Sequence, residues 1–294
     1  MLNHNLSTVP ALTSNLSSSS LSIFSPEMNN FQLLEYFILR EVDQCKSWST
    51  LFRLNSPSTD LMSQFLSNDA CRTYISKFVL PIVLMVEKSN TDNIVPREVA
   101  LKTIKQVTQS IGQCPEIIMS ISNSLRRIVS IKFPNHWNIA VASFIFLRSI
   151  SPAIVTPEKI GIKCKKLTDK QRDLKLSIVK SLQELVNSSI SKPTSSSSLS
   201  SLEEEACCET DGKDKDLTDY FNRISVTPNN PDRTQRFKIS PQYRNKSTYN
   251  LKQYVNDSRN EENLNDPVLL KVEEVLLAIE EKQSFMKKLK KIFK

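Results

Sequence analysis

Apolar residues recur every three or four positions over most of residues 31–190, which is the spacing of one face of a helix. Ser56 followed by Pro57 is typical of a helix start, because serine caps the first turn and proline needs no partner for an amide there. No stretch alternates with a period of two. The pattern therefore predicts an all-α helical bundle, in which the first two helices begin near Phe31 and at Ser56-Pro57. Further helices are predicted at 72–80, 82–88, 97–111, 116–131, 137–150 and 170–190. Several of them are separated by prolines, at Pro81, Pro96, Pro115 and Pro134.

The segment 137–150 is apolar on nearly every side, which predicts the central helix of the bundle. The longest uncharged stretch in this region, 133–147, contains Asn135, His136 and Asn138 and is shorter than a membrane-spanning helix. We therefore expect no membrane-spanning segment here.

The chain divides into four parts by composition. Residues 1–30 are rich in Ser, Asn, Leu and Pro without periodicity, and we expect them to be disordered. Residues 31–190 form the helical domain, and residues 191–265, with a serine run and an acidic cluster, are expected to be a disordered polar linker. Residues 266–294 predict an amphipathic basic helix, since apolar residues recur at spacings of four and three and its last ten residues carry five lysines.

Composition excludes several classes of function. The 294 residues include three glycines, too few and too scattered for a loop that cradles phosphate, so no nucleotide site of the usual kind is expected. Six cysteines without paired spacing and two histidines predict no metal site. A self-contained hydrolase is not expected either, because acids such as Glu41 and Asp43 lie beside a helix without a convergent base.

The net charge of +8 favours an acidic partner, which could be nucleic acid, anionic lipid or an acidic protein face. Nucleic acid is not expected, because no motif of interleaved basic and aromatic residues occurs. Residues 1–26 hold no Lys or Arg and so lack the basic start of a secretory signal. We expect a cytoplasmic protein, with residues 266–294 offering a peripheral contact to an anionic membrane surface.

Two arginines stand in short motifs at the edges of predicted helices. Arg53 lies in the loop between the first two helices, after Leu51 and Phe52. The ordinary interpretation is a surface guanidinium whose stem packs on neighbouring aliphatic groups. In the functional interpretation, a loop held at both ends projects the permanently charged, forked guanidinium into the phosphate site of a partner.

Arg148 lies near the end of the predicted helix 137–150. A cation there meets the unsatisfied carbonyls and negative end of the helix, which alone could explain the residue. In a functional interpretation its five donors bind carbonyls of the loop that carries Arg53, and so hold that loop in one conformation.

Three elements together resemble the Ras GTPase-activating protein (RasGAP) domain family. The strings Leu51-Phe52-Arg53-x-Asn55-Ser56 and Phe146-Leu147-Arg148-x-x-x-Pro152-Ala153-Ile154-x-x-Pro157 are similar to the finger loop and the FLR signature of that family. Lys180-Ser181-Leu182-Gln183-x-x-x-Asn187 resembles a later helix of the family that faces the GTPase. The order and approximate separation of the elements also agree, over about residues 31–190.

The resemblance implies a helical domain that binds a Ras-type small GTPase in its GTP form and accelerates GTP hydrolysis by that GTPase. The domain would not be an enzyme by itself. Arg53 would be the arginine finger, supplied in trans, with Arg148 and Asn55 supporting its loop. GTP and Mg²⁺ would be bound by the partner. The residues implied to bind the GTPase are Phe52, Leu147, Lys180, Gln183 and Asn187.

An alternative is a GTPase-binding scaffold without catalytic effect, associated with a membrane through residues 266–294. Both arginines favour an active protein, whereas Leu54 favours the scaffold, because family members often have a small residue just after the finger arginine. Asp60 stands where several members carry lysine, which predicts a reversed charge on the rim of the docking surface. Serine-rich sequence also replaces the helices expected after residue 190.

Overall fold

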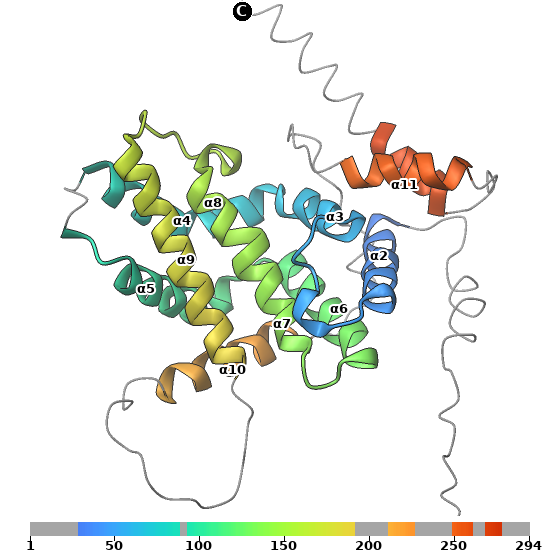
Figure 1. The fold of residues 1–294 in the computed structure, drawn as a ribbon, viewed down its shortest axis with the longest axis horizontal. Coiled ribbons are helices and arrows are strands. Elements are labelled where there is room, and N and C mark those ends of the chain that lie inside the picture. The colour runs from blue at the N-terminus through green and yellow to red at the C-terminus, as the bar shows by residue number, and fades with distance from the viewer. Residues whose placement is uncertain (1–28, 89–92, 192–210, 227–248, 261–267, 278–294) are drawn as a thin grey trace, which may run out of the picture.

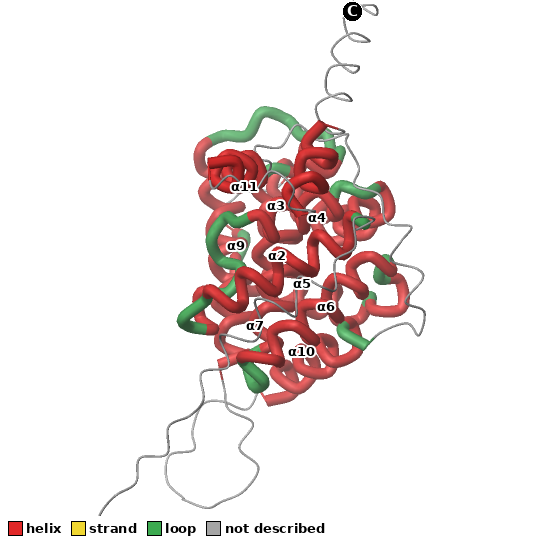
Figure 2. Tube along the Cα trace, turned by 90° about the vertical axis from the view of Figure 1, so that its right-hand side faces the viewer, coloured by secondary structure: helices red, strands yellow, loops and turns green. Residues whose placement is uncertain are grey.

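The structure is a computed structural model, and it describes residues 29–88, 93–191, 211–226, 249–260 and 268–277. Every regular element in these residues is a helix, which confirms the all-α fold class. Figure 2 shows the helices packed side by side, with loops only at their ends. The longer helices are α2 Asn30–Gln44, α3 Pro57–Leu66, α4 Asp69–Lys88, α5 Pro96–Gln109, α6 Glu116–Lys132, α9 Asp169–Ser191, α10 Asp211–Ile224 and α11 Tyr249–Asn260.

The first two helices begin at capping boxes. The side chain of Asn29 accepts the N–H groups of Phe31 and Gln32, and Gln32 returns a bond to the Asn29 N–H at 2.8 Å. Ser56 and Thr59 make the same reciprocal pair ahead of α3, with Pro57 at the first helical position. The helix start predicted at Ser56-Pro57 is therefore confirmed.

The predicted break at Pro81 is wrong. Helix α4 runs unbroken from Asp69 to Lys88, with Pro81 inside it. An internal proline costs a helix about 3 kcal/mol. Phe78, Val79, Ile82 and Val83 are buried around it, and each such burial contributes about 1.5–3 kcal/mol. Packing on both sides of the proline therefore outweighs the lost hydrogen bond.

The central helix extends further than the predicted 137–150. It comprises α7 Trp137–Ala142, the π-helical segment η5 Ser143–Ile150 and α8 Ser151–Val155. Pro152 lies inside this continuous helix, one residue after the junction between η5 and α8, and it removes one backbone hydrogen bond there. A π segment inside an α-helix is rare and commonly marks a functional position, and this one carries Arg148.

This central helix also corrects the expectation that nothing here is long enough to cross a membrane. Residues Trp137–Val155 are long and apolar enough by length and composition, with a mean hydropathy of 1.6. However, 72% of the apolar window is buried inside the protein. That burial is what the core helix of a bundle shows.

The linker expected at 191–265 contains two helices, which the composition concealed. Helix α10 buries Leu217, Tyr220, Phe221 and Ile224, at the helical spacing of three, one and three. Helix α11 buries Leu251, Tyr254 and Val255. Each of these helices has only a narrow apolar stripe within very polar sequence. The serine-rich and acidic flanks therefore dominate the average composition of residues 191–265. Helices after residue 190 are therefore present.

Residues 268–277 are helical and bury Val268, Leu269, Val272 and Val275, as the predicted amphipathic spacing requires. The lysine-rich end of that predicted helix, at 278–294, lies outside the described residues, as does the predicted disordered segment except for its last two positions.

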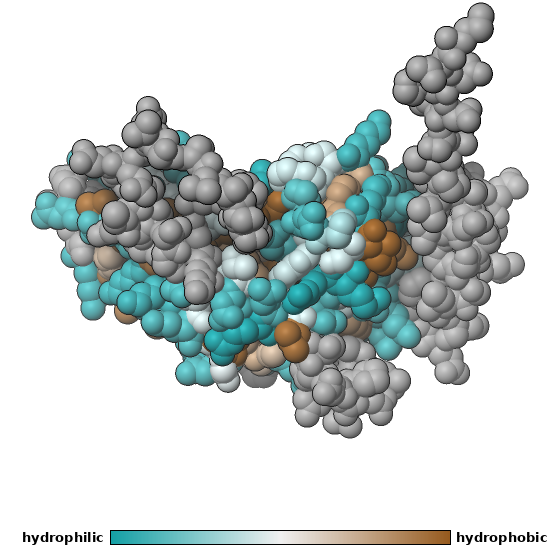
Figure 3. Space-filling view, turned by 90° about the horizontal axis from the view of Figure 1, so that it is seen from below, coloured by the Kyte–Doolittle hydropathy of each residue, from teal (hydrophilic) through white to brown (hydrophobic). Residues whose placement is uncertain are grey.

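The helices pack so that distant parts of the chain lie next to each other. Helix α5 packs along α9, α2 packs on α6 and α3, and α10 packs against α6, α7 and α9. Figure 1 shows α11 beside α3, at the opposite end of the molecule from α5. The face seen in Figure 3 is mostly hydrophilic, with hydrophobic residues in small separate areas.

Candidate functional site

The Arg53 loop, residues 45–56, connects α2 to α3 and changes from core to solvent within one residue. Leu51 and Phe52 are fully buried, whereas Arg53 is exposed and Leu54 is 74% exposed. Phe52 has φ 54°, in the left-handed region that residues other than glycine rarely adopt. The Arg53 N–H closes the turn by donating to the Thr50 carbonyl at 3.3 Å. The buried pair thus anchors a turn that presents Arg53 outward.

The burial of Phe52 corrects its assignment to the GTPase-binding residues. Its side chain is 0% exposed and belongs to the main core cluster. A ring without accessible surface cannot contact a docking protein. Its place in the structure is that of an anchor, and the unusual φ is held by this packing.

Arg148 binds three successive parts of the Arg53 loop. Its Nε donates to the Phe52 carbonyl at 2.9 Å, one terminal nitrogen donates to Asn55 Oδ1 at 2.9 Å, and the other donates to the Leu54 carbonyl. All three acceptors lie within two residues of Arg53. A planar, rigid fork of donors suits such a task, because it fixes several acceptors at once.

The environment of Arg148 is partly buried and negatively charged. Burial lowers the pKa of its guanidinium, and the nearby carboxylates of Glu41 and Asp60 act in the opposite direction. An arginine pKa starts so high that the group remains charged at neutral pH. Its three bonds are therefore charge-assisted, which makes them stronger than bonds between neutral groups.

Glu41 holds the same loop from the side of α2. Its Oε1 accepts the Phe52 N–H at 3.1 Å, and its Oε2 accepts the hydroxyls of Ser56, at 2.5 Å, and Ser58. In the sequence, Glu41 stands out only as a candidate acid for a hydrolase, which is not expected. The available signal was its position, because Glu41 falls in the apolar stripe of its helix with Leu34 and Ile38, where a carboxylate needs polar partners.

Asp60 is not on a rim, so that expectation is wrong. Its side chain is buried, with 5% of the residue exposed, and accepts the backbone N–H of Asn250 at 3.1 Å and the Asn250 side-chain amide at 3.3 Å. Burial raises the pKa of this carboxyl to about 7, although the bonds from Asn250 and Leu251 and the charge of Arg148 oppose the rise. Helix α11, which covers Asp60, could not be placed there from sequence.

The residues predicted on the later helix form one polar face of α9. Lys180, Gln183 and Asn187 are three and four residues apart, while Ile178, Leu182 and Val186 on the other side are buried. Asn187 Oδ1 lies 3.5 Å from a terminal nitrogen of Arg53. The structure thus brings the exposed arginine to the end of this face, across 134 residues of sequence.

The other predicted positions are less closely connected. Lys180 is exposed and lies 4.0 Å from Glu184 on its own helix, a weak surface pair. Leu147 is half-buried beside Arg148 in η5. The site therefore combines a clamped loop, one exposed guanidinium and a polar helix face.

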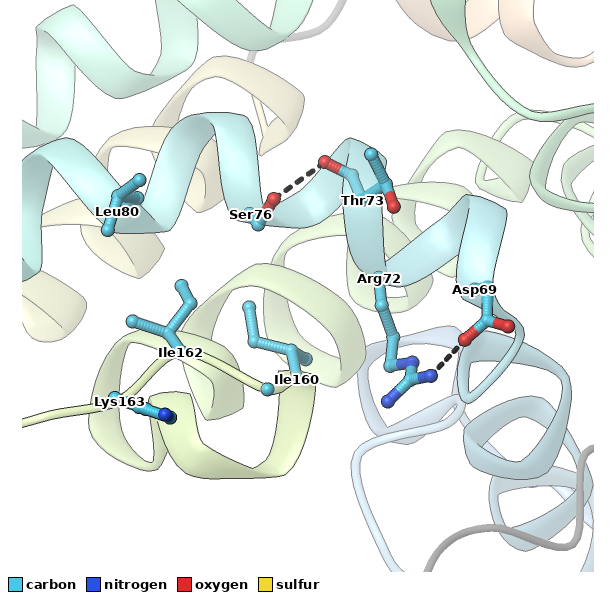
Figure 4. Close-up of a pocket in the computed structure, with 9 residues that line it drawn as sticks. Asp69, Arg72, Thr73, Ser76, Leu80, Ile160, Ile162 and Lys163 are labelled. Carbon is cyan, nitrogen blue, oxygen red and sulfur yellow. Dashed lines mark hydrogen bonds and ion pairs between the residues drawn. The ribbon is translucent and has the colours of Figure 1, made fainter.

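A separate hollow of about 490 Å³ lies between α4 and the segment η6 Pro157–Ile160 (Figure 4). Leu80, Ile160 and Ile162 form its apolar part. Arg72 points to Asp69 on the same helix and pairs with it. None of the residues predicted for the site lines this hollow.

Comparison with known proteins finds one family. Residues 85–187 match the RasGAP family, described as GTPase-activator protein for Ras-like GTPase. This segment contains Arg148 and the polar face of α9 but not Arg53. Among similar proteins, RasGAP-activating-like protein 1 of Mus musculus is 24% identical over 190 residues, covering 52% of this chain and 24% of its own length.

Two further relatives show the same limits of coverage. Inhibitory regulator protein IRA1 of Saccharomyces cerevisiae is 24% identical over 158 residues, which cover 48% of this chain and 5% of the yeast protein. Ras GTPase-activating protein 2 of Mus musculus is 35% identical over 65 residues, covering 21% of this chain and 8% of its own. The chain thus spans less than a quarter of the length of each of these three relatives.

Proposed function

The chain belongs to the RasGAP family through residues 85–187, and from this we propose that it stimulates GTP hydrolysis by a Ras-type small GTPase in its GTP form. In this proposal the protein is not an enzyme by itself. GTP and Mg²⁺ stay bound to the partner, and the contribution of this chain is Arg53, supplied in trans.

The observation that carries the proposal is the contrast between Arg53 and its surroundings. The guanidinium of Arg53 is exposed, while its two neighbours in the sequence are held in place. Phe52 is buried and is bound by Arg148 and Glu41, and the Leu54 carbonyl is bound by Arg148. A cation fixed in advance stabilises charge that develops on a transferred phosphoryl group without having to reorganise. In Ras-type systems generally, an arginine finger raises the rate of GTP hydrolysis by roughly 10³- to 10⁵-fold.

The weak contact between Arg53 and Asn187 is compatible with this role. A distance of 3.5 Å between an exposed nitrogen and an amide oxygen marks a bond that is easily exchanged. In the proposed complex, Arg53 leaves Asn187 for the β- and γ-phosphates of GTP. Lys180, Gln183 and Asn187 would then face the GTPase, together with Leu147.

The proposal is tested by single-turnover GTP hydrolysis with a panel of Ras-type GTPases. Arg53→Ala should lower the maximal stimulated rate by at least about 10³-fold, with little effect on binding of the GTP form. Arg97→Ala, which changes an exposed arginine in the first turn of α5, is the matched control and should stimulate as the unchanged protein does. Equal stimulation by Arg53→Ala would refute the finger role.

One observation favours the alternative of a scaffold without catalytic effect. Leu54 is 74% exposed and follows the finger directly, so its branched side chain must enter the contact with the GTPase. Binding of the GTP form without stimulation, by the unchanged protein, would decide for the scaffold.

We also propose a cytoplasmic location, where Ras-type partners would be met. The cysteines of the described residues, Cys45, Cys71, Cys114 and Cys164, are all unpaired, which suits a reducing compartment. Peripheral contact with an anionic membrane through residues 266–294 is a separate proposal, and liposome association of a chain that lacks these residues would test it.

A further inference from the structure

A second hollow, of about 260 Å³, borders the Arg53 loop on the side away from α9. Its walls come from α2, from the start of α3 and from α11. Asn55 and Ser56 of the loop form one wall, and Asn250, Gln253 and Asp257 of α11 form another. The loop that carries Arg53 therefore has α9 on one flank and α11 on the other, and Figure 1 shows these helices on different sides of α3.

Helix α11 is held firmly in this position. Asn250 donates two hydrogen bonds to the buried Asp60 of α3. The ring of Tyr254 packs edge-on against Phe37 of α2, with centroids 5.0 Å apart, and the guanidinium of Arg40 lies 5.2 Å from the Tyr254 ring centroid. The helix thus presents a defined surface next to the loop.

From this arrangement we infer that α11 is part of the docking surface for the GTPase, with Gln253 and Asp257 in contact with it. The inference rests on the proposed function, because it takes Arg53 as the centre of the contact. A stable protein interface buries about 800 Å² on each partner, which corresponds to a disc of about 16 Å radius. Asn55 is two residues from Arg53, hence within about 7 Å along the chain. A disc centred on Arg53 therefore reaches the wall of the hollow that Asn55 forms.

The chemistry of the hollow favours a polar part of the GTPase. Amides of Asn55, Asn250 and Gln253 and the carboxylate of Asp257 supply hydrogen-bonding groups around its opening. Gln253 and Asp257 are exposed and one helical turn apart, so they can act on the same partner segment. A polar loop beside the nucleotide site of the GTPase fits this lining better than an apolar segment.

The test is the dependence of GTP hydrolysis on GTPase concentration, using the full chain and the double variant Gln253→Ala/Asp257→Lys. We expect KM to rise about five- to tenfold, with kcat unchanged, because contacts of this kind affect association and leave the finger intact. Asn256→Ala, an exposed position on α11 that does not line the hollow, is the matched control and should keep the original KM. Thermal unfolding checks that all variants fold equally.

If the double variant destabilises the fold, the single variant Gln253→Ala replaces it, with an expected two- to threefold rise, on the order of a peripheral interface contact. An unchanged KM, alongside loss of stimulation in Arg53→Ala, would overturn the role of α11 and leave the proposed function standing. If the unchanged protein binds without stimulating, the same comparison is made on the Kd for the GTP-loaded GTPase. An equal Kd for the variant and the unchanged protein would then overturn the inference.

Discussion

Arg148 and Glu41 bind the two polar backbone groups of Phe52, Arg148 through the carbonyl and Glu41 through the N–H. A cation and an anion, 107 positions apart in the sequence, thus satisfy complementary groups of one residue. Phe52 also has the unusual positive φ. Backbone strain of this kind persists where surrounding contacts over-determine the conformation, and these two side chains supply such contacts.

Arg148→Ala should lower both stability and stimulated hydrolysis. The substitution leaves the Phe52 and Leu54 carbonyls and Asn55 without their donor, at a cost of about 1–3 kcal/mol in the free energy of unfolding. A loosened loop misplaces Arg53, and we expect the maximal stimulated rate to fall about 10- to 100-fold. Chemical denaturation and single-turnover hydrolysis measure the two effects.

Arg148→Lys separates charge from geometry in this experiment. Lysine keeps the positive charge but cannot reproduce the three-point fork. Its rate should lie much closer to that of Arg148→Ala than to that of the unchanged protein. Full activity of the lysine variant would mean that only the charge matters.

Glu41→Ala should act on the same loop from α2. It removes the acceptor of the Phe52 N–H and of the Ser56 and Ser58 hydroxyls, and bonds to a charged group contribute about 1.5–3 kcal/mol. Stability should drop by about 2 kcal/mol, and the stimulated rate should fall with Arg53 still present. Glu41→Gln keeps an acceptor for the N–H and should lose less of both, whereas equal losses would argue against the hydrogen-bond explanation.

Asp60 should make stability depend on pH. Burial raises the pKa of its carboxyl from the usual 3.8 to about 7, so between these values the folded state binds a proton that the unfolded state has lost. The contribution of Asp60 therefore becomes less favourable as pH rises from about 4 to about 7, by roughly 2–4 kcal/mol. Unfolding measured at about pH 5 and about pH 8 should show a larger loss for the unchanged protein than for Asp60→Asn.

Asn250 provides the internal check. Its two bonds favour the charged form of Asp60 and lower the pKa of the carboxyl against the effect of burial. Asn250→Ala keeps the backbone bond and removes the side-chain bond, so the pKa of the Asp60 carboxyl should rise and its titration should move to higher pH. No displacement of the titration would show that another group causes the pH dependence.

Helix α10 should be required for the fold. Phe221 is buried and contacts the Phe146 ring edge-on, with centroids 6.4 Å apart, so Phe221→Ala should cost about 3–5 kcal/mol. Thr218→Ala, at an exposed position of the same helix, should leave the unfolding free energy within about 0.5 kcal/mol. Equal unfolding curves for both variants would mean that α10 is not part of the folded core and that the segment is the linker predicted from its composition.

Much of the fold could be predicted because its helices have wide apolar faces. The start of α3 and the extent of α9 follow from capping and periodicity. The break at Pro81 was predicted wrongly, since local rules give proline its full cost while the packing of Phe78 and Ile82 is tertiary. Helix α10 was missed because window composition hid the spacing of Leu217, Tyr220 and Phe221.

The candidate site was predictable where chemistry and motif coincide, as at Arg53 and Arg148, whose proposed roles await the experiments above. Burial was not predictable in the same way. Phe52 was expected on the surface and Asp60 on a rim, yet both are inside. The burial of Phe52 depends on one unusual backbone φ angle. The burial of Asp60 depends on α11, which lies far along the chain and packs over it.

The bond between Asp60 and Asn250 joins residues 190 positions apart, and this separation has a consequence during synthesis. Glu41, the Arg53 loop and Arg148 have all been made by residue 148, so the clamp around the loop can assemble early. At about 5–20 residues per second, Asn250 follows Asp60 by roughly 10–40 seconds. Throughout that interval the carboxyl of Asp60 lacks both of its bonds from Asn250. The ribosome thus makes the loop and its clamp first and makes α11, the cover over α3, about 100 residues after Arg148.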